Sequence, residues 1–434
     1  MARPAGGPSL DPMPRIIIAG GGIAGLEALI ALRGHLGSTA QIELLEANAD
    51  LLERQRAVSE PFGGGPVRRF DLVRIAADHG AHLRPDRLAS VDAEAHSVRT
   101  VRGDTLDYDA LLVAVGARAD MAIPGALTFT GPRDVAAFSA LLDDLDSGRV
   151  RRVAFALPTA VTWALPLYEL ALMTGEHVRA RGLRDVGLVL VTPERSPLEA
   201  FGTRIASQIW SLLAERRIAV CTHSVPLRAG PGGLIVAHGE PVQVERIVSL
   251  PRLAGPWIGG LPHDGQGFLP TDDRGAVLGT EAVWAAGDGT AFPLKQGGLA
   301  AQQASAAAAA IASALGADVP AEPFRPILRG MLLDPAGPRF LDSERGDVPS
   351  TPLWWPPTKV VAPHLWNYLG PGGTTASADA DEIDVGDLLI GLADRHAALG
   401  EKTLALRCLD AAAQVRGTLP PEAAARRDEL AAAR

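Results

Sequence analysis

Residues 15–29 join an apolar strand, a glycine turn and a helix, and this stretch constrains the fold more than any other segment. Residues 16–19 are all apolar and predict a buried strand. Gly20, Gly22 and Gly25 then have the G-x-G-x-x-G spacing. The first glycine of such a turn permits the bend, the second lets the backbone approach a pyrophosphate, and the third lets helix and strand pack closely. The stretch therefore predicts the start of a dinucleotide-binding α/β domain.

A carboxylate follows where such domains hold the ribose of an adenosine. The next predicted strand, residues 41–46, ends in Glu46, and an acid about 20 residues beyond the glycines is the usual partner of the ribose hydroxyls. The glycine spacing alone is weak evidence in a chain with 47 glycines. Strand, helix and acid together indicate dinucleotide binding, and the alternative is a buried βαβ unit that binds nothing.

Composition excludes several classes of protein. The 434 residues suggest about two to three domains, and a net charge of −9 argues against a nucleic-acid surface. Two cysteines, Cys221 and Cys408, supply neither a disulfide framework nor a C-x-x-C motif. No apolar run is long enough to span a membrane, and the residues before Arg15 lack the apolar core of a signal peptide. We therefore expect a cytoplasmic protein.

The rest of the chain reads as two α/β units with a different C-terminal part. Residues 49–66 predict a glycine-rich loop without helix or strand, and residues 106–116 predict one continuous buried strand that ends in Gly116. A second α/β unit follows, and residues 282–286 predict a strand before Gly287. The expected elements of the second unit are strands at 152–157, 186–191 and 217–221 and helices at 165–181 and 203–216.

These pieces resemble the flavoproteins with two dinucleotide-binding domains, the pyridine nucleotide-disulfide oxidoreductase superfamily. The resemblance rests on the glycine turn, Glu46, the strand that ends at Gly116, and the motif of residues 286–288. Within this superfamily, the Lys-Gln-Gly-Gly motif of residues 295–298, which leads into an alanine-rich helix, is similar to the sulfide:quinone oxidoreductase and type II NADH dehydrogenase branch. Tyr168-Glu169 and residues 192–198 also fit the sulfide:quinone side, and the resemblance covers about residues 15–316.

The resemblance implies an α/β fold with two Rossmann-like three-layer dinucleotide-binding domains, the second inserted in the first. The expected FAD-binding domain is split between residues 13–123 and 270–317. Residues 124–269 would form a second, NAD(P)-binding-like domain. A capping or interface segment at 318–376 and a helical tail at 385–434 would complete the chain.

The resemblance also implies which residues contact FAD. Glycine-turn residues would hold the pyrophosphate, Glu46 the adenosine ribose and Asp288 the ribityl chain, while Gly116 would lie along the middle of the cofactor. The implied set is Gly20, Gly22, Ile23, Ala24, Gly25, Glu46, Ala47, Gly116, Gly287, Asp288, Lys295, Gln296 and Gly297.

Lys295 and Glu169 are the two expected catalytic residues. A reduced flavin is anionic along its N1–C2=O edge, so a lysine and helix N-terminal amides would stabilise it there. The alternative for Lys295 is a surface salt bridge. In the resembling enzymes an acid at the position of Glu169 lies near the flavin and the quinone pocket, where burial would raise its pKa for proton transfer. The alternative for Glu169 is a helix-surface glutamate.

Two departures from the family limit the functional prediction. Positions 156, 158 and 161, where a second glycine fingerprint would fall, are Ala156, Pro158 and Val161, so NAD(P)H is not expected in the usual pose. Glu194 is expected to be a solvated loop residue rather than a ribose ligand. Residues 162–164 hold no cysteine where a sulfide:quinone oxidoreductase needs one, so sulfide oxidation by that mechanism is not supported.

The remaining features leave alternatives open. The histidines lack metal-ligand spacing, so we expect no metal. Trp354, Trp355 and Trp366 indicate either packing of a domain seam or a peripheral membrane contact for quinone entry. The tail resembles one tetratricopeptide-type hairpin, which is too little for a solenoid and favours a docking element or a homodimer contact.

The sequence therefore predicts an FAD-dependent oxidoreductase that passes electrons between an unidentified donor and a small acceptor such as a quinone. One alternative is an NAD(P)H dehydrogenase with an atypical nicotinamide site. A second alternative is a flavin-bound redox sensor or interaction protein whose helical tail recruits a partner.

Overall fold

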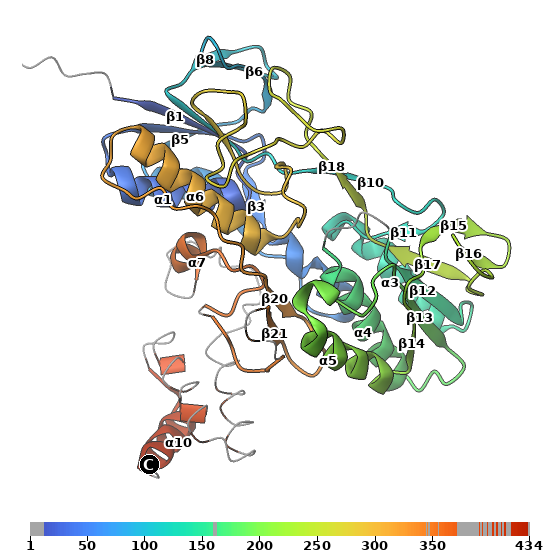
Figure 1. Ribbon diagram of the computed structural model, residues 1–434. Helices are drawn as coiled ribbons and strands as arrows, with labels where there is room; N and C mark the ends of the chain where they lie inside the picture. Colours follow the sequence, from blue (N-terminus) through green and yellow to red (C-terminus); the bar gives the residue numbers. More distant parts are fainter. Residues whose placement is uncertain are drawn as a thin grey trace, which may run out of the picture. The chain divides into compact units, whose positions relative to one another are not determined.

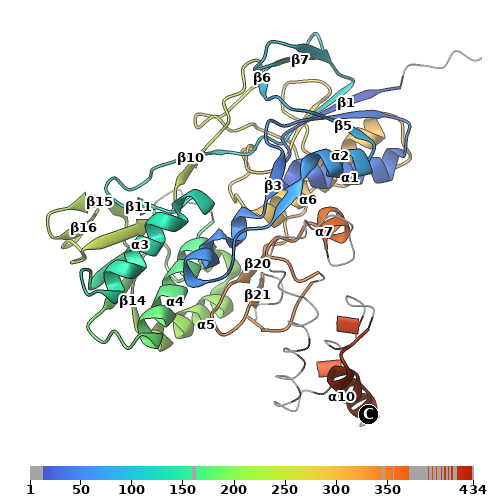
Figure 2. The same ribbon diagram turned by 180° about the vertical axis from the view of Figure 1, so that it is seen from behind.

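The computed structural model describes residues 13–158, 163–343, 345, 348–354, 356–370 and 418–432, together with single positions between 390 and 413. The chain forms two compact units, each built from separate segments (Figures 1 and 2). Unit 1 comprises the described parts of residues 1–51, 71–118 and 254–326. Unit 2 comprises the described parts of residues 52–70, 119–253 and 327–434.

Unit 1 is built on a five-stranded parallel sheet with the strand order β19-β9-β1-β2-β5. Its strands are β1 (Arg15–Ala19), β2 (Gln41–Leu45), β5 (Ala81–Arg84), β9 (Ala110–Val113) and β19 (Val283–Ala285). Residues 16–19 of the central strand β1 are all apolar and buried. The strand has a neighbouring strand on each side and is covered on both faces, which favours apolar residues throughout.

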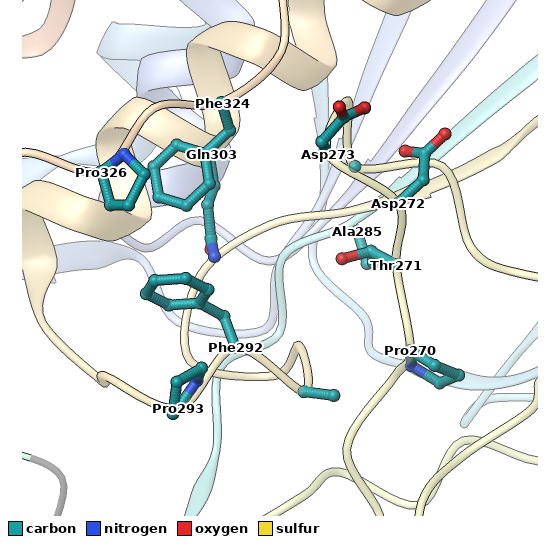
Figure 3. A pocket seen from close by; sticks show the side chains of 12 residues that line it. Pro270, Thr271, Asp272, Asp273, Ala285, Phe292, Pro293, Gln303, Phe324 and Pro326 are labelled. Carbon is teal, nitrogen blue, oxygen red and sulfur yellow. The ribbon is translucent and has the colours of Figure 1, made fainter.

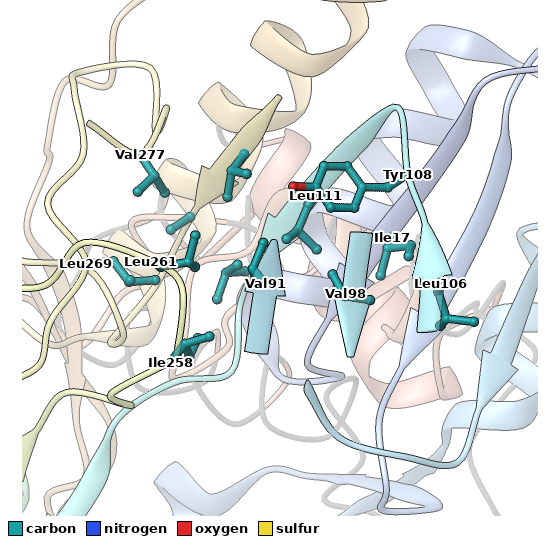
Figure 4. Packing of buried hydrophobic residues seen from close by; sticks show 13 residues of the cluster. Ile17, Val91, Val98, Leu106, Tyr108, Leu111, Ile258, Leu261, Leu269 and Val277 are labelled. Carbon is teal, nitrogen blue, oxygen red and sulfur yellow. The ribbon is translucent and has the colours of Figure 1, made fainter. Parts of the chain in front are cut away.

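Two different layers cover this sheet. Helices α1 (Ile23–Leu36) and α6 (Gly297–Ala314) lie side by side (Figures 1 and 2), and α2 (Leu72–Asp78) precedes β5. Strands β6 (Leu88–Asp92), β7 (Ser97–Thr100) and β8 (Thr105–Asp107) form an antiparallel sheet. Figure 4 shows the apolar cluster that joins this sheet to the parallel one, including Ile17, Val98 and Leu111. Ile18, the next residue of β1, lies instead close to Gly25 of α1, as strand alternation requires.

Unit 2 contains a second five-stranded parallel sheet, with the order β11-β17-β12-β13-β14. Its strands are β11 (Leu127–Thr128), β12 (Arg152–Ala156), β13 (Gly187–Val191), β14 (Ile218–Cys221) and β17 (Arg246–Ser249). Helices α3 (Val135–Asp146), α4 (Leu165–Ala180) and α5 (Thr203–Glu215) connect successive strands. The hairpin of β15 (Pro226–Gly230) and β16 (Gly233–Val236) packs Leu234 against this sheet. Both units therefore have the mixed α/β, Rossmann-type architecture that the sequence predicts.

The remaining elements are short. Strands β3 (Asp50–Leu52) and β4 (Arg69–Asp71) form one two-stranded sheet, and β10 (Arg118–Asp120) and β18 (Arg252–Ala254) form another. The C-terminal part of unit 2 contains the hairpin β20 (Arg329–Leu332) and β21 (Arg339–Asp342), helix α7 (Pro363–Leu369) and helix α10 (Pro421–Ala432). Short 3₁₀ helices occur at Arg54–Phe62, Pro132–Asp134 and Glu199–Phe201. No helix among the described residues is both long enough and apolar enough to cross a bilayer.

Two local predictions are wrong. Residues 106–116 do not form one strand, because Tyr108 and Asp109 separate β8 from β9 and the two strands belong to different sheets. Residues 49–66 are not a structureless loop, since they contain β3 and the 3₁₀ helix Arg54–Phe62. Within this helix the Ser59 hydroxyl donates to the carbonyl of Arg56, and Ala57 and Val58 are buried.

Candidate functional site

The glycine turn of unit 1 is too tightly packed for side chains at two of its positions. Gly20 has a φ of +111°, and a β-carbon there would lie 2.3 Å from the carbonyl oxygen of Ala114. A β-carbon on Gly25 would lie 1.8 Å from the carbonyl oxygen of Gly20. Both distances are too short for any real contact, so only glycine lets β1, β9 and α1 approach so closely.

Gly22 differs from these two glycines. Apart from its neighbours in the chain, no described residue places an atom within 4 Å of the position that its β-carbon would take, and its φ of −81° suits any residue. Gly22 is also the N-cap residue of α1, and Ile23 and Ala24 open the helix. Backbone N–H groups at a helix start have no partner within the helix and attract anions. The free space therefore lies where the second glycine of the fingerprint admits a pyrophosphate.

Glu46 connects this turn to the loop after β2. Its Oε2 accepts a hydrogen bond from the Gly21 backbone at 3.0 Å. Its Oε1 accepts hydrogen bonds from the backbone N–H of Asn48 at 2.8 Å and from the Asn48 side-chain amide at 2.6 Å. The structure thus brings the half-buried Glu46 carboxylate beside the glycine turn, and the adjacent Ala47 is exposed.

The carboxyl ends of two further strands meet at the same edge of the sheet. Gly116 follows β9 with a φ of +72°, and Gly287 follows β19 with a φ of +84°. A β-carbon on Gly287 would lie 3.1 Å from the side chain of Ala24, so α1 approaches this backbone closely. Asp288 comes next, and burial of its carboxyl raises its pKa although the positive charge of Lys295 acts in the opposite direction.

Lys295 is buried rather than exposed at the surface. Only 7% of the residue is accessible, its ammonium donates to the carbonyl oxygen of Thr290, and Nζ lies 4.0 Å from the ring centroid of Phe268. Burial lowers its pKa to about 8, although the carboxylates of Asp288 and Asp264 act in the opposite direction. The alternative of a surface salt bridge is therefore wrong.

Two glutamine side chains hold α6, one at its start and one within the helix. Gln296 is the N-cap residue, and its Oε1 accepts a hydrogen bond from the Leu299 backbone at 2.8 Å, while Gly297 opens the helix. Gln303 was not expected in the site. Its Oε1 accepts a hydrogen bond from the Gly287 backbone at 2.8 Å and so fastens α6 to the loop that carries Asp288. Its only signal in the sequence is an amide inside an alanine-rich helix.

Glu169 lies in α4 of unit 2 and is completely buried. Its Oε1 accepts hydrogen bonds from the Leu333 backbone at 2.8 Å and from the ammonium of Lys359. Its Oε2 is also buried, and no described residue donates a hydrogen bond to it. The alternative of a helix-surface glutamate is therefore wrong.

The charges of Glu169 and Lys359 depend on each other. Burial raises the pKa of Glu169 and lowers the pKa of Lys359, and the opposite charge of each partner counteracts this effect. Lys359 is 6% exposed and lies 190 residues from Glu169 in the sequence. Nothing in the local sequence around either residue indicates this pairing.

A second ion pair in unit 2 joins a buried carboxylate to a partly exposed arginine. Glu53 is 1% exposed, and its Oε2 lies 2.7 Å from Nε of Arg68. The Arg68 guanidinium lies 5.3 Å from the ring centroid of Phe70 and 5.5 Å from that of Trp366. The negative charge of Glu53 also acts to raise the pKa of Lys359. Unit 2 therefore includes the buried charged side chains Glu53, Glu169 and Lys359, and the partly exposed Arg68 has aromatic neighbours.

The turn after β12 lacks the features of the turn in unit 1. Ala156 and Pro158 occupy the first two fingerprint positions, whereas Val161 and Thr162 lie outside the described residues. The Trp163 and Phe201 rings lie 5.7 Å apart, and a β-carbon on Gly330 of β20 would lie 3.3 and 3.2 Å from these two side chains. Side chains and the C-terminal hairpin thus pack beside this turn.

Glu194 is not a solvated loop residue, and that prediction is wrong. Its Oε2 accepts hydrogen bonds from the Tyr168 hydroxyl at 2.5 Å and from the Thr192 hydroxyl at 2.8 Å. Burial raises its pKa, and the hydrogen bond from Tyr168 opposes this shift. The acid that follows β13 is therefore already engaged by the protein.

Cysteines and metal ligands add little to the site. Cys221 is a partly buried free thiol at the end of β14, and Cys408 lies outside the described residues. No group of three His, Cys, Asp or Glu residues in the described parts of the chain could hold a metal ion.

Comparison with known proteins is consistent with this geometry. The family model described as pyridine nucleotide-disulphide oxidoreductase matches residues 14–313. An NADH dehydrogenase-like protein of Mycobacterium tuberculosis (strain CDC 1551 / Oshkosh) is 24% identical over 305 residues, which cover 64% of this chain and 72% of that protein.

Two solved structures share the fold. The sulfide:quinone oxidoreductase of Aquifex aeolicus has a TM-score of 0.68 and 18% identity, covering 76% of this chain and 83% of that one. The ferredoxin reductase of the CYP199A2 system of Rhodopseudomonas palustris has a TM-score of 0.59 and 17% identity, with coverages of 75% and 81%. The family match spans well over half of the sequence, and its residues include the glycine turn, Glu46, Gly116, Asp288 and Lys295. The chain belongs to the pyridine nucleotide-disulphide oxidoreductase family.

Proposed function

We propose that the chain is an FAD-dependent oxidoreductase that passes electrons from a donor to a small acceptor such as a quinone. The observation that carries this proposal is the contrast within the glycine turn. The fold itself requires Gly20 and Gly25, whereas no described residue other than the chain neighbours of Gly22 fills the space beside it. A ligand that approaches the backbone there explains a glycine that the fold does not require.

The other residues at this edge of unit 1 fit the same cofactor. In this proposal the amides that open α1 face the pyrophosphate, Glu46 and Ala47 face the adenosine, and Asp288 faces the ribityl chain. The positive φ of Gly116 and Gly287 keeps side chains away from the middle of the cofactor. FAD bound there would supply the redox chemistry, because its ring system accepts and releases electrons.

Lys295 and the start of α6 would tune this chemistry. The Lys295 ammonium is buried, and the backbone at Gln296 and Gly297 forms the N-terminus of an 18-residue helix. A buried cation and a helix N-terminus both stabilise negative charge in their neighbourhood. We propose that they stabilise the negative charge of the reduced cofactor.

Glu169 and Lys359 would hold a proton for the acceptor. Reduction of a quinone to a quinol consumes two electrons and two protons, so such an acceptor needs a proton source. The Glu169 carboxyl is buried, and one of its oxygens accepts a hydrogen bond from Lys359, whereas the other has no hydrogen-bond donor among the described residues. The quinone as acceptor is supported by the name of the structurally similar Aquifex aeolicus protein.

The domain division is part of the proposal. Residues 13–123 and 270–317 would form the FAD domain, residues 124–269 a second domain with an altered nucleotide site, 318–376 a capping segment and 385–434 a helical tail. The tail or the capping segment would provide a peripheral membrane contact or a homodimer contact in an otherwise cytoplasmic protein.

Two other functions follow from the sequence, and one of them has support from a relative. The name of the mycobacterial relative favours NADH as donor, but Ala156, Pro158 and the engaged Glu194 oppose binding in the usual pose. A redox sensor that recruits a partner through its tail is the other candidate. Deleting residues 385–434 would then abolish partner binding and leave flavin reduction intact.

Gly22→Ala tests the proposed cofactor site, with Gly34→Ala in the same helix as control. Beyond the adjoining residues and the backbone of the helix itself, neither added methyl group meets an atom of the described residues within 4 Å, so both variants are expected to fold normally. We expect Gly22→Ala to bind FAD about tenfold more weakly or worse, which corresponds to about 1.4 kcal/mol, and Gly34→Ala to bind it normally. Unchanged FAD affinity in Gly22→Ala, or a wild-type protein that takes up no FAD, would overturn the proposal.

A further inference from the structure

Unit 1 contains a cavity of about 430 Å³ that the proposed FAD site does not explain (Figure 3). It lies beside the loop after β19, and all of its lining residues belong to unit 1. Its volume falls in the range of small-molecule sites, about 300–1,000 Å³. The walls combine aromatic side chains with a few polar groups, and these polar groups indicate what the cavity can bind.

A hydrogen-bond donor faces the cavity. Gln303 is 8% exposed and lines the cavity, and its Oε1 accepts the hydrogen bond from the Gly287 backbone. Because a backbone N–H can only donate, the amide oxygen must face Gly287 and the amide nitrogen must point the other way. Nε2 makes no hydrogen bond to any described residue, and Figure 3 shows it near Phe292. An inward-facing donor without a partner favours a ligand that carries an acceptor.

Aromatic side chains form the wall next to this donor. The rings of Phe292 and Phe324 lie 5.2 Å apart at 76° to each other, and Pro293 and Pro326 extend the apolar surface. The segment that carries Phe324 is held in place because its backbone N–H donates to the carbonyl of Asp273 at 2.6 Å. This wall suits the face or edge of a flat ring.

Carboxylates lie on the other side of the cavity. Figure 3 shows Asp272 and Asp273 across from Gln303 and the two phenylalanines. Both aspartates are exposed, and Arg274 Nη1 lies 3.6 Å from Oδ1 of Asp273. Oδ1 of Asp272 accepts backbone hydrogen bonds from Arg274 and Ala276. Two carboxylates beside one arginine leave this side of the cavity acidic, which favours a positive group and disfavours an anion.

We propose that this cavity binds a small aromatic compound with a carbonyl oxygen at one end and a protonated amine at the other. The carbonyl accepts a hydrogen bond from Gln303 Nε2, the ring packs against Phe292 and Phe324, and the ammonium faces Asp272 and Asp273. The proposal does not depend on FAD. Gln303 nevertheless links the two sites, because its other amide atom holds the loop that carries Asp288.

The test uses the purified full-length protein and four matched probes, with binding followed by isothermal titration and saturation-transfer NMR. The probe that combines both recognition elements is 4-(aminomethyl)benzamide. Benzylamine lacks the carbonyl, benzamide lacks the positive charge, and benzoate carries a negative charge instead. We expect 4-(aminomethyl)benzamide to bind up to about tenfold more tightly than benzylamine, as one added hydrogen bond allows, and we expect no binding of benzoate.

Variants assign the binding to this cavity. Phe324→Ala is expected to weaken the binding of 4-(aminomethyl)benzamide, benzylamine and benzamide. The surface variant Asp272→Asn/Asp273→Asn is expected to remove the preference for 4-(aminomethyl)benzamide over benzamide, even if Phe324→Ala does not fold. Asp107→Asn/Asp318→Asn, at two exposed aspartates of unit 1, serves as the charge-matched control and is expected to bind all probes as the wild type does. The proposal would be overturned if 4-(aminomethyl)benzamide did not bind the wild type. It would also be overturned if both cavity variants bound this probe as tightly as the wild type does.

Discussion

Lys359 donates a hydrogen bond to Glu169 inside unit 2, and this contact joins helix α4 to a proline-rich segment 190 residues later in the chain. Both side chains are almost completely buried. The pair therefore fixes the position of the C-terminal segment as well as the proposed proton-holding group. A buried pair of this kind is sensitive to loss of one partner, because the other charge is left without compensation.

We expect Glu169→Gln and Lys359→Met each to lower the free energy of unfolding by about 3–5 kcal/mol, the usual cost of breaking a buried ion pair. The double variant should lose less than the sum of the two, because neither unpaired charge remains. Urea unfolding of the four proteins measures this coupling. Additive losses would show that the two side chains do not act as a pair.

We expect Tyr108→Phe to stabilise unit 1 by about 1 kcal/mol. The Tyr108 hydroxyl is buried without a hydrogen bond to any described residue, and burial raises its pKa to about 12. Phenylalanine keeps the ring that stacks on His96 at 5.6 Å and removes the unpaired hydroxyl. Thermal unfolding of the two proteins is the measurement, and a lower midpoint for the variant would contradict the described surroundings of this ring.

We expect Gly25→Ala to unfold the glycine turn and release the cofactor, because its β-carbon would lie 1.8 Å from the carbonyl oxygen of Gly20. Gly34→Ala in the same helix meets no atom within 4 Å and should stabilise the protein by about 0.5–1 kcal/mol. Circular dichroism and flavin absorbance of the two purified variants provide the comparison. A yellow, stable Gly25→Ala protein would contradict the close packing of α1 on this turn.

Lys295 predicts a pH dependence of stability. Its pKa is about 8 in the folded protein, against an ordinary value of 10.5. Between these two values the unfolded chain binds more protons than the folded one, so this residue makes stability rise with pH across that window. Lys295→Met should lack this contribution. Lys402→Met, at an exposed lysine, should keep it.

The measurement for Lys295 is the free energy of unfolding in urea at about pH 7, below the window in which the lysine titrates, and at about pH 9.5, within that window. Both variants share all other titrating groups with the wild type, so the difference between proteins isolates the lysine. An identical pH response of wild type and Lys295→Met would contradict the lowered pKa.

We expect NADH and NADPH to leave the oxidised-flavin absorbance unchanged in an anaerobic titration, while dithionite bleaches it. The reason is the turn after β12, where Ala156 and Pro158 replace glycines and the nearby acid Glu194 is already bonded to Tyr168. Rapid bleaching by NADH would instead identify an NADH dehydrogenase with an atypical nicotinamide site.

The sequence predicts the fold at places where the backbone conformation allows only certain residue types, and where those residues lie close together in the chain. The spacing of Gly20, Gly22 and Gly25 reports a close strand–helix contact, and the structure has that contact at Gly20 and Gly25. Alternation within β1 likewise assigns Ile17 and Ile18 to opposite faces of the sheet. Signals of this kind need only a few neighbouring residues.

What the sequence did not predict depends on distant residues. The buried Glu169 is bonded to Lys359, and the partly buried Glu194 is bonded to Tyr168, so neither environment follows from the local pattern. The break between β8 and β9 is also non-local, since apolar residues on both sides of Tyr108 belong to different sheets. In these places contacts with distant residues determine the structure, and the local sequence pattern does not.

The split of unit 1 along the chain has a consequence for its synthesis. Strand β9 ends at Val113, and β19, which pairs with it, begins at Val283. At a translation rate of about 5–20 residues per second, β9 is synthesised roughly ten to thirty seconds before β19, its neighbour on the side away from β1. During that interval an apolar strand edge and the surface later covered by α6 are exposed, so the nascent chain is a natural client for chaperones that shield unfinished sheets.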